Sequence, residues 1–496
     1  MPDLTDVRPT DAVAHLEIED AWLVDPSTGR EGRGSLTVDD GRIVEIAWRS
    51  ERGRSRAGTG EPPATGKPRR QGVSVAGGED SQILVAPGLI DLHAHLREPG
   101  GEDAETIATG LAAAAHGGFT AVGLMPDTHP ALDRSEAVTR VRTTAAATGS
   151  PVRALPYGTI TLDRQGKGLA PLPSLAGAGA VAFTDDPVPL DDPDLLRAAL
   201  VEAGLLGRCV VQVADDRALT AGAEANEGLT ATILGLQGAP AGAEAAGAAR
   251  AIAVLRQVVA EAPHPVRPRL HLAHVSTRLA LDVVRAAKAE GLPVTCDVTP
   301  YHLTLHEGWV AGDRRYAWDI GDAPWAGGPA DAGPYDSSTR VDPPLRSATD
   351  AMALLAGVED GTVDAIATDH APHRSIDKDV PYGEALPGIS GLETALSLVL
   401  AAVDAGALSL GAAVRALTSG PWKVLGGAEG PLEEPALREG ALADLLVVDR
   451  ADRWTVTGKK LASKGRNTPL LGCSLAGVVL LTVAGGRIAY MDPSLD

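Results

Sequence analysis

The residues whose spacing most clearly permits chemistry are two histidines, His93 and His95, which directly follow the apolar run that starts at Ile83. Side chains alternate between the two faces of a strand, so both imidazoles point to the same side. Two imidazoles at a strand end can bind one divalent metal ion. A His-x-His pair alone is more often structural or coincidental, so the metal interpretation needs further ligand-type residues.

Further ligand-type side chains follow or end later apolar runs: Asp185 and Asp186, then His274, then Asp369. Each alone could be a helix cap, a core histidine or a turn residue. Taken together, imidazole and carboxylate ligands predict a site for a hard or borderline divalent ion that keeps one position open for water. Such an ion lowers the pKa of its bound water towards about 7, which provides hydroxide near neutral pH.

The elements that must position these residues are short apolar runs alternating with Ala- and Leu-rich helical stretches between about residues 85 and 370. This alternation predicts an α/β fold, a (β/α)8 TIM-type barrel, whose chemistry lies at the carboxyl ends of the strands. The predicted strands are Leu89–His95, Thr120–Met125, Val152–Pro156, Ala180–Phe183, Cys209–Val213, Leu270–Val275, Val294–Val298 and Ala365–Thr368.

Strand-like segments also flank the predicted barrel, and we expect the two ends of the chain to pair into a small β-sandwich domain. The predicted division is residues 1–87 for the N-terminal part of the sandwich, 88–425 for the metal-dependent barrel and 426–496 for the C-terminal part. Residues 50–80 are rich in Arg, Gly, Pro and Ser, which predicts a flexible insert. Residues 306–340 are irregular in composition and predict an active-site loop.

Composition excludes several classes of protein. The 496 residues carry a net charge of −21 and have a pI of about 5.0, which disfavours a nucleic-acid partner. Three dispersed cysteines are too few for a disulfide framework or a cysteine metal cluster. We find no apolar run long enough to cross a membrane and no signal-peptide pattern, so the expected location is cytoplasmic.

The motifs, read in order, resemble those of the dihydroorotase family within the amidohydrolase superfamily. The resemblance extends over nearly the whole chain, apart from the inserts near 50–80 and 310–338. The matching stretches are Asp91–Gly100, Met125–Thr128, Phe183–Asp186, His274–Thr277, Val298–Leu303, Asp342–Arg346, Ala367–His373 and Gly388–Thr394.

The resemblance implies the reversible ring closure of N-carbamoyl-aspartate to dihydroorotate, a reaction of pyrimidine synthesis. It implies that His93 and His95 bind zinc and that Asp186 takes the bridging place that a carboxylated lysine fills in related enzymes. It implies that His274 binds a second metal. Asp369 would bind the first metal and move the proton to or from the amide nitrogen, as general acid and base.

The same resemblance assigns the substrate contacts. Arg97 would hold the substrate carboxylate through two parallel hydrogen bonds. His373 would contact the substrate ring, and Gly388 belongs to a substrate-binding stretch. The expected partners are a small-molecule substrate and further copies of the chain in a homo-oligomer, with neither nucleic acid nor membrane.

The chain departs from the family at the end of the fifth predicted strand, where Val213 replaces a metal-binding histidine. Valine cannot ligate a metal, so we predict one zinc ion and a second site that is weak or absent. Strand alternation directs Gln212 to the opposite face. Asp215 has the parity of Val213 but lies past the predicted strand end, which makes it a weaker candidate.

Two further departures add charge, because Asp127 and Asp342 stand where the family has asparagines that help to hold the substrate carboxylate. Arg97 could neutralise one aspartate, which would leave at least one negative charge unanswered. A like charge in a low-dielectric pocket costs on the order of a few kcal/mol. The alternative is that these aspartates point away or pair with Arg346. Tyr301 replaces the first of two adjacent histidines of the family, with smaller consequences expected.

Three functions stay open on the sequence. The first is a dihydroorotase that works with one metal. The second is a related amidohydrolase of specialised metabolism with a different substrate. The ring of that substrate would lack the acid group and carry an amidine or amino group, as in dihydrocytosine. The third is a non-catalytic paralogue with a structural role, which the retained first-metal ligands and Asp369 disfavour.

Overall fold

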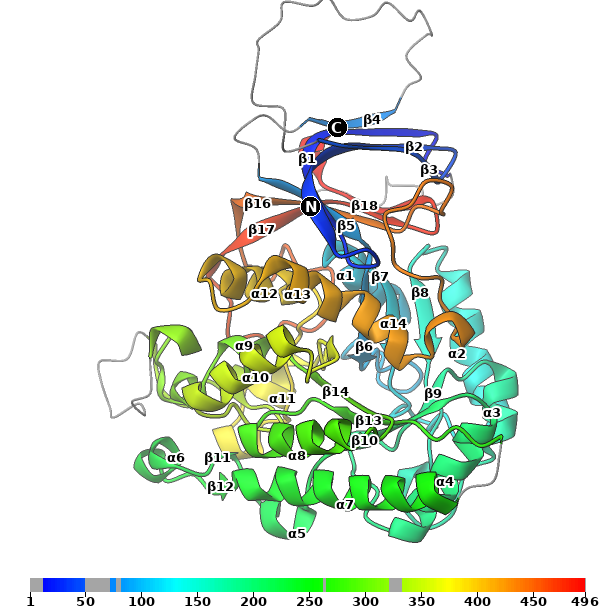
Figure 1. Cartoon of the computed structure of the whole chain (residues 1–496). Helices are drawn as coiled ribbons and strands as arrows, with labels where there is room; N and C mark the ends of the chain where they lie inside the picture. The colour runs from blue at the N-terminus through cyan, green and yellow to red at the C-terminus, as the bar shows by residue number, and fades with distance from the viewer. Residues whose placement is uncertain (1–11, 50–71, 77–81, 262–264, 321–331, 496) are drawn as a thin grey trace, which may run out of the picture.

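The computed structural model describes residues 12–49, 72–76, 82–261, 265–320 and 332–495. Short parallel strands form the centre of the fold, and each lies within or overlaps a predicted apolar run (Figure 1). These strands are β6 (Leu89–Ala94), β7 (Phe119–Leu124), β8 (Arg153–Pro156), β9 (Ala182–Phe183), β10 (Cys209–Val213), β13 (Leu270–Ala273), β14 (Val294–Val298) and β15 (Ala365–Ile366).

The central strands pair in parallel in two sheets, in the orders β6-β7-β8 and β9-β10-β13-β14-β15. Isolated parallel bridges join the two sheets at both edges, where Gly158 pairs with Phe183 and Ala94 pairs with His370. The second bridge places the end of β6, with its histidines, beside the end of β15. Most residues of these strands are buried, which explains why they read as continuous apolar runs without alternation.

Helices connect consecutive central strands and lie outside them (Figure 1). Side-chain caps fix the starts of several helices. The Thr277 hydroxyl accepts a hydrogen bond from the backbone N–H of Ala280 at the start of the helix Arg278–Ala289, and the Asp192 carboxylate caps the helix Pro193–Leu205. Among the described residues no helix is long and apolar enough to span a membrane. The longer helices are α1 (Ile107–His116), α2 (Ser135–Ala147), α3 (Leu172–Ala178), α4 (Pro193–Leu205), α7 (Ala241–Glu261), α8 (Arg278–Ala289), α10 (Ala348–Asp360), α12 (Ala395–Asp404), α13 (Leu410–Leu417) and α14 (Ser419–Val424).

Short elements lie between the longer ones, mainly after β10 and after β14. They are α5 (Arg217–Thr220), β11 (Ala225–Asn226), α6 (Leu229–Leu234), β12 (Gly238–Ala239), α9 (Pro300–Thr304) and α11 (Ser375–Lys378). In the stretch 306–340, the described residues form short 3-10 helices around the buried Trp309, which packs in one apolar cluster with Tyr301 and Leu305. This stretch therefore forms a small core beside the end of β14, and residues 321–331 lie outside the described chain.

The sequence predicts a small β-sandwich from the two ends of the chain. In the structure, strands from both ends lie in one continuous sheet of eight strands in the order β18-β17-β16-β5-β1-β2-β3, with β4 beside β1. Apolar side chains from both chain ends form a separate core cluster. Of the expected insert at 50–80, only residues 72–76 lie within the described chain, and they contain a strand that pairs in parallel with β1. The strands are β1 (His15–Asp25), β2 (Arg30–Asp39), β3 (Arg42–Trp48), β4 (Val73–Ala76), β5 (Ile83–Pro87), β16 (Leu445–Thr455), β17 (Ser474–Ala484) and β18 (Arg487–Met491).

Candidate metal centre and active site

The two histidines of the His-x-His pair converge on one carboxylate. His93 lies on β6 and His95 follows that strand, anchored by a hydrogen bond of 2.8 Å from its backbone N–H to the carbonyl of His370. Asp186 Oδ1 lies 3.2 Å from His93 Nε2 and 3.4 Å from His95 Nε2. All three side chains are buried, and their ligand atoms lie within 4.8 Å of one another.

The other two predicted ligands face the same cluster. Asp369 Oδ1 lies 3.6 Å from His93 Nε2 and 3.5 Å from His95 Nε2. His274 Nε2 lies 3.4 Å from the second oxygen of Asp186. Both residues have backbone angles in the left-handed region, with φ of 46° for Asp369 and 38° for His274. The ends of four central strands thus bring all five predicted ligands together.

Unpartnered atoms in this cluster fit a divalent metal ion. His93 Nε2 and Asp186 Oδ1 are buried and have no hydrogen-bond partner in the described structure. A buried polar atom without a partner is costly, and most such atoms in proteins are satisfied. A cation between imidazole nitrogens and carboxylate oxygens would satisfy both atoms, and this donor set suits a borderline divalent ion.

Charges within the cluster shift the pKa values of its members in opposite directions. Burial alone would lower the pKa of the histidines, but Asp127 and Asp369 raise that of His95 to about 10, and the hydrogen bond and charges of Asp186 and Asp369 raise that of His274 to about 9. Burial would raise the pKa of Asp369, but the hydrogen bond from His95 and the charges of His93 and His274 lower it to about 2. The carboxylates are therefore ionised and available as ligands.

Two further buried aspartates hold the ligand-bearing segments. Asp91 accepts hydrogen bonds of 2.7 Å from both the backbone N–H and the hydroxyl of Thr368. Asp297 Oδ1 accepts a hydrogen bond of 2.6 Å from the backbone N–H of His274. Our sequence reasoning missed both. The available signal for Asp91 was its parity with His93 on the same strand.

Asp127 contacts His95 on the side away from the nitrogen that faces Asp186. Its Oδ2 lies 2.9 Å from His95 Nδ1 and 2.9 Å from Arg97 Nη1. A carboxylate on the second nitrogen fixes the orientation of a ligating imidazole. The charge of Asp127 is answered by both neighbours, so the expected repulsion of a substrate carboxylate is smaller than the sequence suggests.

Asp342 lies apart from this cluster. Its side chain is 47% exposed, and its Oδ2 lies 3.3 Å from Nη1 of Arg217. The alternative prediction is that this aspartate points away or pairs with Arg346. Only the pairing is wrong, because the buried Arg346 donates hydrogen bonds to Ser276 and Asn226. Both aspartates that replace family asparagines, Asp127 and Asp342, therefore have a basic partner.

The predicted substrate-contacting residues His373 and Gly388 lie against each other. His373 Nε2 lies 2.8 Å from the carbonyl of Pro387. Gly388 has a φ of 140°, and a Cβ at that position would lie 2.6 Å from the Cβ of Ala371 and 3.0 Å from His373 Nε2. Only glycine fits this close approach without displacing neighbours.

Two residues that sequence reasoning missed hold this loop. The buried Lys378 ammonium donates to the carbonyls of Leu386 at 2.7 Å and Gly388 at 3.2 Å. Asn467, from the C-terminal part of the chain, donates to the carbonyls of Ala371 and Gly388, both at 2.9 Å. The loop is thus held from two directions.

Val213 ends β10, is buried and offers no ligand atom. Gln212 donates instead to the carbonyl of Leu190, and Asp215 accepts a hydrogen bond from Thr220. Neither replaces the missing histidine in the described structure. A second metal would therefore have only Asp186 and His274 as protein ligands.

Comparison with known proteins identifies the family. Residues 82–266 match a family model described as dihydro-orotase-like. A dihydroorotase of Anaeromyxobacter dehalogenans (strain 2CP-C) is 39% identical over 487 residues, which cover 97% of this chain and 99% of that protein. A dihydroorotase of Pelotomaculum thermopropionicum is 40% identical over 481 residues, which cover 96% of this chain and 99% of that protein. The chain belongs to the dihydroorotase family.

Membership of the dihydroorotase family makes the chain a hydrolase that acts on C–N bonds of cyclic amides. Solved structures share its fold over nearly the whole length. An L-hydantoinase (dihydropyrimidinase) from Arthrobacter aurescens has a TM-score of 0.74 at 21% identity and covers 96% of both chains. A dihydropyrimidinase from Brevibacillus agri NCHU1002 has a TM-score of 0.69 at 17% identity, over 96% of this chain and 95% of that one. The fold is therefore that of amidohydrolases.

Proposed function

We propose that this chain interconverts dihydroorotate and N-carbamoyl-aspartate with one zinc ion held by His93, His95, Asp186 and Asp369. The convergence of these four buried side chains carries the proposal, since two of their facing atoms have no hydrogen-bond partner in the described structure. A non-catalytic paralogue would have no need of such an arrangement. The family and its near-full-length relatives support the reaction.

Each residue has a separate task in ring opening. A metal ion held by these residues would lower the pKa of a water molecule towards about 7, which favours loss of its proton near neutral pH. Asp369, ionised and next to the histidines, takes the proton from the attacking water and delivers it to the leaving amide nitrogen. In the reverse direction the same carboxylate removes the proton from the amide nitrogen.

Arg97 binds the substrate carboxylate in this proposal. Its side chain is 18% exposed, and its direction is set by Asp127 and by a hydrogen bond of 3.2 Å from its Nε to the carbonyl of Pro372. His373 and Gly388 lie on the neighbouring loop, where they would contact the ring. Asp342 is half exposed and pairs with Arg217, so in this proposal it does not contact the substrate directly and affects substrate binding only through the position of its loop.

The same proposal includes the architecture that supports the site. The eight parallel strands, bridged at both edges, would form a closed (β/α)8 barrel over residues 88–425. Residues 1–87 and 426–496 would form one sandwich-like domain around their shared apolar cluster. Assembly of the chain into a homo-oligomer follows from the family resemblance, and sedimentation of the purified protein tests it.

The decisive experiment is steady-state ring opening of dihydroorotate by the zinc-loaded protein, with Asp369→Asn as the blank. Turnover that depends on Asp369 supports the proposal. No turnover from folded, metal-bound protein would reject dihydroorotate as the substrate. Dihydrocytosine, whose ring lacks the carboxylate, is then the next substrate to assay.

A further inference from the structure

The hydroxyl of Tyr301 contacts the residue to which we assign proton transfer. Tyr301 lies in α9, directly after β14, and donates a hydrogen bond of 2.5 Å to Asp369 Oδ2. The other oxygen of Asp369 faces His93 and His95. The two oxygens of this carboxylate therefore have different neighbours: Oδ2 contacts the Tyr301 hydroxyl, and Oδ1 faces the two histidines.

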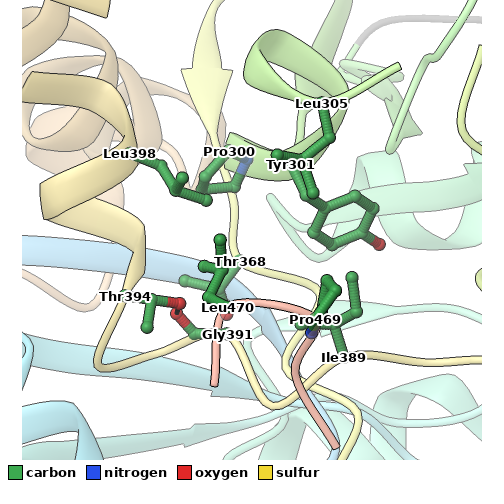
Figure 2. A pocket seen from close by; sticks show the side chains of 10 residues that line it. All are labelled: Pro300, Tyr301, Leu305, Thr368, Ile389, Gly391, Thr394, Leu398, Pro469 and Leu470. Atoms are coloured by element: carbon green, nitrogen blue, oxygen red, sulfur yellow. Dashed lines mark hydrogen bonds between the residues drawn. The ribbon is translucent and has the colours of Figure 1, made fainter. Parts of the chain in front are cut away.

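Packing fixes the ring of Tyr301 in place. The residue is 2% exposed, and it belongs to an apolar cluster with Leu305, Trp309 and Ile389. Figure 2 shows the ring among the residues that line a cavity of about 10 Å³, with the hydroxyl directed away from the other labelled side chains. A cavity of that size holds at most one water molecule. The ring thus has little freedom to move, and the position of its hydroxyl is set by the core behind it.

We propose that Tyr301 is a positioning residue that holds Oδ2 of Asp369, and so keeps Oδ1 directed at the metal-binding histidines. This inference rests on the proposed function. A carboxylate near a metal can rotate about its last bond or engage the ion with both oxygens, and a fixed donor on one oxygen opposes both changes.

The consequence for catalysis is geometric. Proton transfer depends strongly on the placement of the reacting atoms, and a displacement of about 1 Å can cost roughly a hundredfold in rate. We assign Tyr301 no contact with the substrate. Its loss should therefore lower kcat and leave KM unchanged.

The test compares Tyr301→Phe, which keeps the ring and its packing, with Tyr490→Phe. The control also removes a hydrogen bond from a tyrosine hydroxyl to an aspartate. Tyr490 lies on β18 of the terminal sheet, and its hydroxyl donates to Asp492 Oδ2 at 3.2 Å. For Tyr301→Phe we expect kcat for dihydroorotate to fall roughly ten- to hundredfold, as for the loss of one charge-assisted hydrogen bond, with KM and zinc content unchanged. The control should keep wild-type kcat.

A second readout does not depend on turnover. The visible absorption bands of the cobalt-loaded protein report the geometry of the ligands, and they should shift in Tyr301→Phe but not in Tyr490→Phe. Unchanged bands, or a raised KM at unchanged kcat, would overturn the assignment of Tyr301. If the wild-type protein does not open dihydroorotate, the proposed function fails, and the cobalt bands alone then decide the role of Tyr301.

Discussion

Asp369 is the residue on which the proposed chemistry depends most. One oxygen faces His93 and His95, and the other accepts a hydrogen bond from the Tyr301 hydroxyl, so both oxygens have neighbours within the site. Asp369→Asn keeps the shape of the side chain but removes the charge and the proton-accepting oxygen. We expect kcat to fall by roughly 10²–10⁴-fold, the usual share of general acid–base catalysis, while circular dichroism shows an unchanged fold. Retention of wild-type turnover would contradict the assigned role.

Asp127 has two opposing effects on the site, since it supports His95 and also occupies Arg97. Asp127→Asn weakens both contacts. We expect the KM for dihydroorotate to fall, because Arg97 is freed to bind the substrate carboxylate. We also expect zinc affinity to fall by roughly ten- to hundredfold, as is usual when the partner of a ligating histidine is lost. Titration with a competing chelator measures the second effect.

Asp342→Asn is the matched control for Asp127→Asn. Asp342 makes an ion pair with Arg217 at the surface, and such pairs contribute about 0–1 kcal/mol. Zinc affinity should therefore stay at the wild-type value and KM should change little. If this variant lost as much zinc affinity as Asp127→Asn, the loss would come from the change in net charge and not from the contact between Asp127 and His95.

The candidate ligand residues carry a signal in the sequence, and the contacts that orient them do not. His93, His95 and Asp369 carry their signal in residue type and in position after an apolar run. The contact between Asp127 and His95, like that between Tyr301 and Asp369, joins residues from different strand ends. Such contacts depend on side-chain rotamers and on which loops meet, and no local pattern encodes either.

At the scale of elements, the central strands lie where the apolar runs predict, but several end early. β15 ends at Ile366, and the backbone N–H of Thr368 then bonds to the side chain of Asp91. β13 ends at Ala273, and the backbone N–H of His274 bonds to Asp297. At these two ends, a buried carboxylate accepts the hydrogen bond from a backbone N–H that would otherwise donate to a carbonyl of a neighbouring strand. Apolar periodicity does not detect this exchange, so the predicted strands run too long beside the site.

A substitution at Lys378 tests how the loop that carries Gly388 is held in place. Its ammonium donates to three backbone carbonyls, including those of Leu386 and Gly388. Lys378→Met keeps the length of the side chain but leaves these carbonyls without the donor. We expect a loss of stability of about 1–3 kcal/mol in urea unfolding, and a raised KM because the substrate loop loosens.

Lys288→Met is the control for this prediction. Lys288 also holds a backbone carbonyl, that of Thr362, and pairs with Asp364. These contacts lie at the amino-terminal side of β15, away from the ligands that follow that strand. The control should lose stability without a change in KM. An unchanged KM in Lys378→Met would mean that the loop is held well enough by Asn467 alone.

At the scale of the whole molecule, the candidate metal site joins distant parts of the chain. Its candidate ligands lie on β6 or follow β6, β9, β13 and β15, and these strands belong to both parallel sheets. A metal that binds only the folded chain stabilises it by mass action, by about 2.7 kcal/mol at a free concentration 100 times the dissociation constant. Removal of zinc by a chelator should therefore lower the unfolding temperature, and zinc should restore it.

The size of this stabilisation should depend on pH. Without metal, the pKa of His95 is raised to about 10 and that of His274 to about 9, so both are protonated at neutral pH. A metal binds only neutral imidazole, so zinc binding must release protons. Zinc affinity, and with it the shift in unfolding temperature, should increase from pH 6 to pH 9 and weaken as the pH falls.

Calorimetry can test this linkage directly. Titration of the metal-free protein with zinc at pH 7, in two buffers of different ionisation enthalpy, gives the number of protons released. We expect at least one proton per zinc ion, because His95 faces the metal site and is charged before binding. The variant Asp127→Asn should release fewer, because Asp127 is the main source of the raised pKa of His95. Zinc binding without proton release would mean that the imidazoles are already neutral, and that the carboxylates around them do not raise the imidazole pKa values.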